Sequence, residues 1–205
     1  FQIKKENSLN FYFIQFSTDH FYDSAIRRTS SEKAKIKILN YYAKTKLLAE
    51  KICVKNSNYL ILRVNFFGKS MTAKETLSDW ILNYTKKNND ITLFSNVYFS
   101  PILLDTLSKI INDILLNKNF LKGIFNLGSK KGLSKLEFGK KILKIFKRYN
   151  IKFRSTKAQN ILKIKRPKNM IMNINKFEKN FNIKLPTLDS EIKKFRKIYK
   201  KSYEI

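Results

Sequence analysis

Cysteine, histidine, glycine and proline are all scarce in this sequence, and each shortage excludes a class of protein. The single cysteine, Cys53, cannot form an internal disulfide framework or a cysteine-based zinc site. The single histidine, His20, leaves too few ligands for a histidine-rich metal site. Five glycines and three prolines in 205 residues exclude collagen-like and linker-like chains. Because 43% of the residues are hydrophobic and 14% are aromatic, wholesale disorder is excluded as well.

Long hydrophobic runs are also missing from the sequence. No stretch reaches the roughly 18 apolar residues of a membrane-spanning helix. The chain begins at Phe1, with Lys4 and Lys5 close by, and no signal peptide precedes the first predicted strand. We therefore expect a soluble protein in the reducing setting of the cytoplasm, without a membrane partner.

Acidic residues are few: 15 Asp and Glu stand against 43 Lys and Arg, which gives a formal net charge of +28. Such a charge is typical of nucleic-acid binders. Only 7 of the basic residues are arginines, however, and the lysines are dispersed along the whole chain. Because phosphate and base recognition favours arginine forks, we interpret the charge as compositional drift and expect no specific nucleic-acid partner. It still predicts loose, salt-sensitive binding to polyanions.

Strand-like and helix-like patterns alternate along the chain. Short aromatic and β-branched runs predict strands at residues 11–17, 59–64, 91–94 and 123–127. Helical periodicity predicts helices at residues 41–54, about 73–87, 103–116, 134–146 and 189–199. The helix at 134–146 begins at a capping box formed by Ser134 and Glu137, and the helix at 189–199 follows Pro186. This alternation predicts an α/β fold with a mostly parallel sheet.

Tyr42 and Lys46 are four residues apart in a predicted helix, so their side chains share one face. An ammonium beside a phenol stabilises the phenolate, which makes tyrosine a usable general acid for a carbonyl oxygen that receives a hydride. Taken alone, the pair is more typical of a solvated helix face, because lysine is so common in this chain.

The strand before this helix ends in Ser17, Thr18 and Asp19, with Thr18 lying 24 residues before Tyr42. Open α/β sheets bind their ligands at the carboxyl ends of the strands. A hydroxyl at this position could therefore hydrogen-bond the same carbonyl that the tyrosine protonates. The alternative interpretation is a simple turn at the strand end.

Several stretches resemble, in order and at similar spacing, the extended short-chain dehydrogenases/reductases, above all the dTDP-4-dehydrorhamnose reductases. They are Ser17-Thr-Asp-His-Phe-Tyr-Asp23, Tyr42-Ala-Lys-Thr-Lys-Leu-Leu-Ala-Glu50, Ile61-Leu-Arg-Val64, Pro101 to Leu107, Gly123-Ile-Phe-Asn-Leu127 and Arg166-Pro-Lys-Asn-Met170. The likeness covers nearly the whole chain. It implies NAD(P)H-dependent reduction of a 4-keto sugar nucleotide, with NADPH or NADH as cofactor, in nucleotide-sugar and cell-surface polysaccharide synthesis.

The resemblance also assigns residues. It implies that Tyr42 is the proton donor, that Lys46 contacts the nicotinamide ribose and that Thr18 orients the sugar carbonyl. It places Ser17, Tyr42 and Lys46 at the cofactor, and Thr18, Asp19, Asn65, Phe66 and Arg166 at the substrate. It implies no metal. The oligomeric state stays open, with a homodimer as one option.

The chain departs from the family pattern at several positions. His20 stands where the family has tyrosine, and we interpret it as a local hydrogen-bonding residue. Phe66 stands for a substrate-stacking tryptophan, although a one-residue deletion leaves Asn65 or Phe67 as alternatives. Arg166 could clamp a diphosphate or lie solvated in a loop. We expect Trp80 and Cys53 to be packing residues.

None of the five glycines lies in the glycine-rich turn that this type of dinucleotide binding needs. We therefore expect the half that carries it to precede residue 1. Residues 1–127 would then be the C-terminal half of a Rossmann domain, with 66–90 contributing to the substrate cleft. Residues 128–205 would form a small α/β substrate-binding lobe, and the fold would be a partial doubly wound parallel sheet.

Three other readings stay open. The chain could be a non-catalytic relative, like the regulatory subunit of methionine adenosyltransferase. It could be a truncated protein that has lost catalysis. A basic nucleic-acid binder would require lysines concentrated on one face beside exposed aromatic residues.

Overall fold

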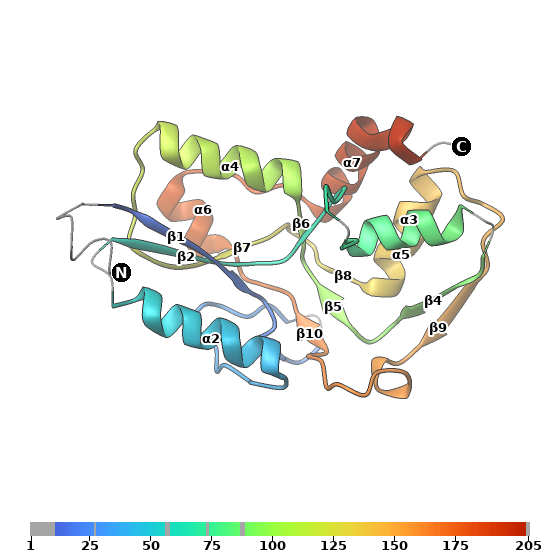
Figure 1. Cartoon of the computed structure of the whole chain (residues 1–205), viewed down its shortest axis with the longest axis horizontal. Helices are drawn as coiled ribbons and strands as arrows, with labels where there is room; N and C mark the ends of the chain where they lie inside the picture. Colours follow the sequence, from blue (N-terminus) through green and yellow to red (C-terminus); the bar gives the residue numbers. More distant parts are fainter. Residues whose placement is uncertain (1–10, 27, 56–57, 73, 87–88, 204–205) are drawn as a thin grey trace.

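A three-stranded parallel sheet forms one half of the molecule (Figure 1). The structure is a computed structural model and describes residues 11–203, apart from residues 27, 56–57, 73 and 87–88. In the order β1-β2-β7, the sheet comprises β1 (Phe13–Thr18), β2 (Tyr59–Val64) and β7 (Gly123–Leu127). Thr18 pairs with Val64, and Val64 with Leu127. The carboxyl ends of all three strands therefore meet at one edge.

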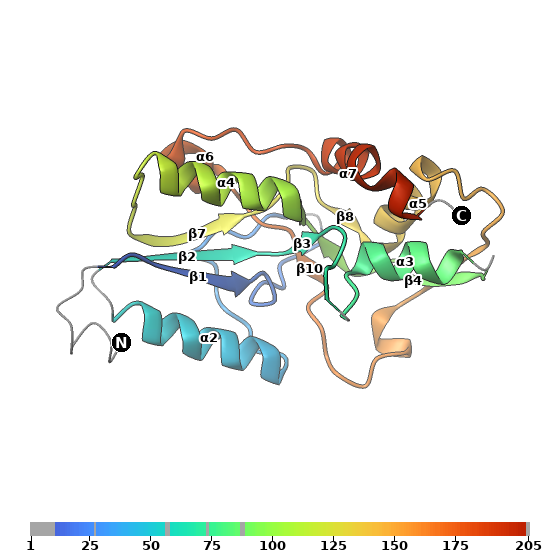
Figure 2. The same cartoon turned by 45° about the horizontal axis from the view of Figure 1, so that its top comes forward.

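Helices cover both faces of this sheet (Figure 2). Helix α2 (Tyr41–Cys53) lies on one face, and α4 (Leu104–Leu116) and α6 (Asn175–Phe181) lie on the other. Parallel strands need crossover connections, and helices on both faces bury the apolar sides of the sheet. The α/β class and the doubly wound parallel arrangement expected from the sequence are confirmed.

The other half of the molecule is built from three helices and short strand pairs (Figure 1). The helices are α3 (Leu77–Thr85), α5 (Lys135–Ile145) and α7 (Leu188–Tyr203). Strand β4 (Ile91–Phe94) pairs in parallel with β9 (Phe153–Thr156), and β5 (Tyr98–Phe99) lies between β10 (Asn169–Met170) and β8 (Leu133–Ser134). Strands β3 (Phe66–Phe67) and β6 (Ile102–Leu103) pair with each other, and a 3-10 turn spans Ala158–Asn160.

Two hydrophobic clusters form the core, one in each half. The first contains Leu60, Leu62 and Phe125 of the sheet together with Phe177 of α6. The second packs residues of α3, α5 and α7, among them Ile81, Phe138 and Phe195. Both clusters contain residues from either side of position 127. In the first, α6 returns to the sheet, and in the second, α3 packs with α5 and α7. The domain boundary inferred from the sequence stays a prediction.

Helix starts follow local capping. Asn40 caps α2, since its side chain accepts a hydrogen bond from the backbone of Ala43 at 2.9 Å. The capping box of Ser134 and Glu137 opens α5, as predicted. Helix α3 begins later than predicted because Thr76 and Asp79 form a second capping box. The predicted ends of this helix, residues 73 and 87, lie outside the described residues. Within the described part of the chain, no helix combines the length and apolar character needed to cross a membrane.

Candidate active site

Three consecutive residues at the carboxyl end of β1, Ser17, Thr18 and Asp19, are buried. The hydroxyl of Thr18 accepts a hydrogen bond from the backbone N–H of His20 at 3.1 Å. One carboxylate oxygen of Asp19, Oδ2, accepts from the side-chain amide of Asn65 at 2.9 Å. The chain after β2 thus holds the turn that follows β1.

Polar atoms at this turn lack partners. Ser17 Oγ, Asp19 Oδ1 and His20 Nδ1 are buried and have no hydrogen-bond partner in the part of the chain that the structure describes. Buried polar groups in folded proteins are nearly always hydrogen-bonded. Three unpaired buried polar atoms within four residues make this strand end a candidate ligand-binding position.

Tyr42 and Lys46 lie one turn apart on α2, next to this turn. The Tyr42 ring meets the ring of His20 edge-on, with centroids 5.2 Å apart, and the residue is 49% exposed. Lys46 Nζ donates to the backbone carbonyl of Phe16 in β1 at 3.0 Å. The predicted pair therefore shares one face with the strand end that carries Thr18, and the phenol reaches solvent.

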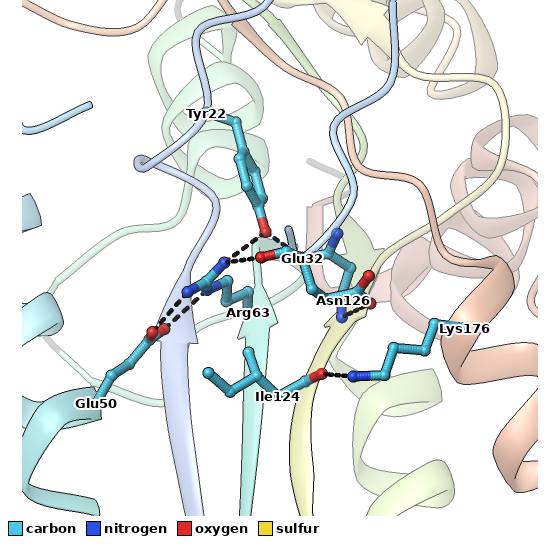
Figure 3. Close-up of polar contacts among 7 residues, drawn as sticks. All are labelled: Tyr22, Glu32, Glu50, Arg63, Ile124, Asn126 and Lys176. Carbon is cyan, nitrogen blue, oxygen red and sulfur yellow. Dashed lines mark hydrogen bonds and ion pairs between the residues drawn. The ribbon is translucent and has the colours of Figure 1, made fainter. Parts of the chain in front are cut away.

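A buried polar network fixes α2 and the loop after β1 against the sheet (Figure 3). Arg63 of β2 forms a bidentate ion pair with Glu50 of α2, with donor–acceptor distances of 3.0 and 2.7 Å. It also donates to the hydroxyl of Tyr22 at 2.9 Å, which in turn donates to Asn126 of β7 at 2.7 Å. Glu50 lies on the same helix as Tyr42. One guanidinium thus links the helix, two strands and the loop.

A cleft of about 990 Å³ opens beside Tyr42 and His20. Its first wall comes from the loop and start of α2, including Asn40 and Tyr42. Its second wall comes from the other half of the molecule and includes Lys74, Glu75, Lys135, Ile164 and Arg166. With Lys44 and Lys165 also lining it, the cleft is strongly cationic, which favours an anionic ligand.

Burial shifts the titration of three groups around the cleft. It raises the pKa of Asp19 from 3.8 to about 7, against the opposing effects of Asn65 and Lys135. It lowers the pKa of His20 from 6.5 to about 4, helped by the charges of Arg166 and Lys135. It lowers the pKa of Lys135 from 10.5 to about 8, again with help from Arg166. Strongly shifted groups gathered at a cleft are typical of functional sites.

The structure brings most of the predicted site residues together. Tyr42 and Arg166 both line the cleft. Thr18, Asp19 and Asn65 are connected by hydrogen bonds to His20 or to each other, and Ser17 lies directly before them. Phe66 is 46% exposed but is not among the residues that line the cleft.

Three interpretations of single residues can be compared with the structure. The local hydrogen-bonding role expected of His20 is wrong for Nδ1, which has no partner among the described residues. Trp80 stacks on Tyr84 and packs against the second cluster, as expected of a packing residue. Cys53 is a buried free thiol, and burial raises its pKa to about 11. No group of three potential metal-binding side chains occurs in the described residues.

Sequence reasoning missed Lys74 and Lys135 as cleft residues. The capping box places Lys135 at the first position of α5, but nothing local shows that this helix start faces Tyr42. That contact depends on how the two halves of the molecule pack.

The RmlD substrate binding domain family model matches residues 4–201 of this chain. The fold is similar to dTDP-4-dehydrorhamnose reductase from Bacillus anthracis in complex with NADP, with a TM-score of 0.79 and 19% identity, over 90% of this chain and 64% of that one. It is similar to the dTDP-4-dehydrorhamnose reductase ortholog from Clostridium acetobutylicum, with a TM-score of 0.79 and 18% identity, over 91% and 65%.

UDP-glucuronic acid 4-epimerase from Bacillus cereus, in complex with UDP-glucuronic acid and NAD, also has a similar fold. Its TM-score is 0.78 at 18% identity, over 98% of this chain and 65% of that one. The chain thus spans less than two thirds of the length of these structures, and at these identities the likeness establishes the fold. A search of curated proteins gave no significant match.

Proposed function

The chain belongs to the RmlD substrate binding domain family, and we propose that it supplies the proton donor and the sugar-binding cleft of an NAD(P)H-dependent reductase of 4-keto sugar nucleotides. The observation that carries this proposal is the position of Tyr42 and Lys46. They lie beside the buried carboxyl end of β1 and at the mouth of a cationic cleft. A sugar nucleotide, with its anionic diphosphate, suits such a cleft.

In the proposed reaction, Tyr42 donates a proton to the carbonyl oxygen of the sugar as that oxygen becomes a hydroxyl. Its exposure at the cleft allows contact with a bound substrate. Thr18 accepts a hydrogen bond from the backbone of His20, whose ring contacts that of Tyr42, and we propose that its hydroxyl orients the same carbonyl. General acids held in this way typically accelerate a reaction by about 10²–10⁴-fold.

The residues present fit the nicotinamide end of a dinucleotide. Bound NADPH or NADH would supply the hydride. Lys46, which donates to the Phe16 carbonyl of β1, and the hydroxyl of Ser17, which has no partner among the described residues, would hold that end. The diphosphate end has no glycine-rich turn among the 205 residues, so this chain accounts for one end of the cofactor alone. No residue in it distinguishes NADPH from NADH.

Asp19, Asn65, Phe66 and Arg166 complete the proposed substrate site. Arg166 is exposed and lines the same cleft as Tyr42, where a guanidinium can pair with phosphate oxygens. We also propose that the protein is cytoplasmic, that it acts in nucleotide-sugar metabolism and that it can form a homodimer.

The test uses the complete coding sequence that contains these residues. We expect the protein to oxidise NADPH or NADH in the presence of dTDP-4-dehydrorhamnose or a related 4-keto sugar nucleotide. Tyr42→Phe should lower kcat about 100-fold or more while leaving the fold intact. Tyr149→Phe is the matched control, since Tyr149 is 71% exposed and does not line the cleft.

Fluorescence titration with NADPH and NADH provides an independent readout. Lys46→Ala should weaken cofactor binding if the lysine contacts the ribose. Undiminished turnover in Tyr42→Phe would refute the role of Tyr42. A complete protein that neither binds cofactor nor turns over would be a non-catalytic relative.

A further inference from the structure

Lys135 lines the same cleft as Tyr42 but belongs to the other half of the molecule. It is the first residue of α5, and only part of its surface is exposed. Its ammonium lies 5.5 Å from the ring centroid of the buried Phe99. The backbone N–H of Lys135 donates to the carbonyl of Val97, but its ammonium has no hydrogen-bond or ion-pair partner among the described residues. An ammonium group carries three donors, and none of them meets an acceptor in the described part of the chain.

The groups near Lys135 share this lack of partners. Asp19 Oδ1 and His20 Nδ1 are buried and unpaired within the described residues, and His20 and Lys135 line the same cleft. The charges of Asp19 and Lys135 influence each other's pKa, yet the two residues form no ion pair. His20 and Lys135 thus present an imidazole and an ammonium to the same cleft, whereas Asp19 is buried and is not among the residues that line it.

This combination matches hydroxyl groups better than phosphate. A hydroxyl both donates and accepts, so it can bridge an imidazole acceptor and an ammonium donor. An ionised phosphate at the same point would offer acceptors to Lys135 but no donor to the imidazole of His20. Arg166, exposed on the same wall as Lys135, is the more suitable partner for a diphosphate.

We propose that Lys135 and His20 recognise ring hydroxyl groups of the hexose and so determine which sugar the site accepts. This inference rests on the proposed function, because it presumes a sugar nucleotide in the cleft. It assigns a role to Lys135 and to His20, the residue at which the sequence departs from its family pattern.

Calorimetric titration of the complete protein, expressed from the coding sequence that contains these residues, tests this without turnover. The probes are dTDP-glucose and UDP-glucose, each compared with its nucleoside diphosphate, dTDP or UDP. Lys135→Met and His20→Phe should each weaken binding of the sugar nucleotide about 10-fold, as expected for loss of a charged or buried hydrogen bond. Binding of the nucleoside diphosphate should change less than about 2-fold.

Lys140→Met is the matched control. Lys140 belongs to the same helix and lies 5.7 Å from the ring centroid of Phe153, but it is exposed and does not line the cleft. It should change neither affinity. Lys135→Arg, which keeps the charge and the donors, should retain much of the affinity for the sugar nucleotide, and it replaces Lys135→Met if that variant fails to fold.

The outcomes separate the inference from the proposed function. Equal losses for sugar nucleotide and nucleoside diphosphate would show that Lys135 contacts phosphate, and unchanged affinities would show no contact; either result overturns the inference. If the unsubstituted complete protein binds neither class of probe, the proposed function fails, and the inference fails with it.

Discussion

Asp19 and His20 are adjacent in the sequence, and burial shifts their pKa values in opposite directions. Burial keeps Asp19 protonated up to a pKa of about 7, and it keeps His20 neutral down to a pKa of about 4. In an unfolded chain the same two groups have pKa values of 3.8 and 6.5. Between about pH 4 and 6.5, the folded pair holds one proton on Asp19 and the unfolded pair holds one on His20. The two contributions to the pH dependence of stability therefore cancel.

Single substitutions should reveal the two contributions to the pH dependence of stability that cancel in the unsubstituted chain. Asp19→Asn leaves His20, whose depressed pKa means that the unfolded state binds more protons, so stability should rise from about pH 4 to 6.5. His20→Phe leaves Asp19, whose raised pKa means that the folded state binds more protons, so stability should fall from about pH 4 to 7. Each slope can reach about 1.4 kcal/mol per pH unit.

Urea unfolding at several pH values in this range measures both slopes. The double variant Asp19→Asn/His20→Phe is the internal control and should return to the flat profile of the unsubstituted chain in this window. Parallel profiles for all four proteins would show that neither group is shifted by the fold.

At the scale of elements, the position of α2 depends on a single buried arginine. The helix carries Tyr42 and Lys46 at its start and Glu50 near its end. Arg63 of β2 holds Glu50 and also the loop after β1, through Tyr22 (Figure 3). Both partners of this ion pair are 3% exposed at their side chains. The pair therefore sets how the helix lies relative to the strand end that carries Thr18.

Removing one member of this pair should be costly. Arg63→Met leaves the Glu50 carboxylate buried without a partner, and we expect the free energy of unfolding to drop by about 3–5 kcal/mol. Removing both charges, in Arg63→Met/Glu50→Leu, should recover much of this loss because no unpaired charge remains. Urea denaturation compares the two variants directly.

Lys130→Met provides the comparison on the surface. Lys130 pairs with Glu178 at 2.8 Å, but the lysine side chain is 40% exposed. Its loss should cost less than about 1 kcal/mol. An effect of Arg63→Met no larger than this would show that the buried network does not hold α2 in place.

At the scale of the whole molecule, the charge of +28 remains the most unusual property. Basic residues occur on helices of both halves, for example Lys44 and Lys51 on α2, Lys140 on α5 and Lys197 on α7. Several of the few acidic side chains, including Glu50 and Glu191, are buried. The surface is therefore more cationic than the net charge alone suggests, and its charge is spread over many elements.

A dispersed positive surface should bind polyanions without selectivity. We expect DNA of any sequence and heparin to bind with similar affinity, and binding should weaken steeply, by about 10³-fold or more, between about 50 and 200 mM salt. Fluorescence anisotropy with two unrelated DNA duplexes and heparin as competitor measures this. Preference for one duplex, or binding that persists at the higher salt, would instead support a nucleic-acid function.

The sequence alone determined the elements, because hydrophobic periodicity and capping act between near neighbours. Strands β2, β4 and β7 have the predicted bounds, and α5 begins at the predicted capping box. Two-residue strands such as β5 and β10 were not predicted, because so short a segment shows no period and forms only when its partner arrives. The pairing of Tyr42 with Lys46 was likewise readable from their spacing.

Only the tertiary structure decided what surrounds that pair. The contact of His20 with Tyr42, the burial of Asp19 and the position of Lys135 in the cleft join segments that are distant in the sequence. Burial sets which groups lose their water and therefore how they titrate, and it depends on the packing of both halves of the molecule. The sequence could thus name the reacting residues, while the packing of the fold determined the environment in which they would act.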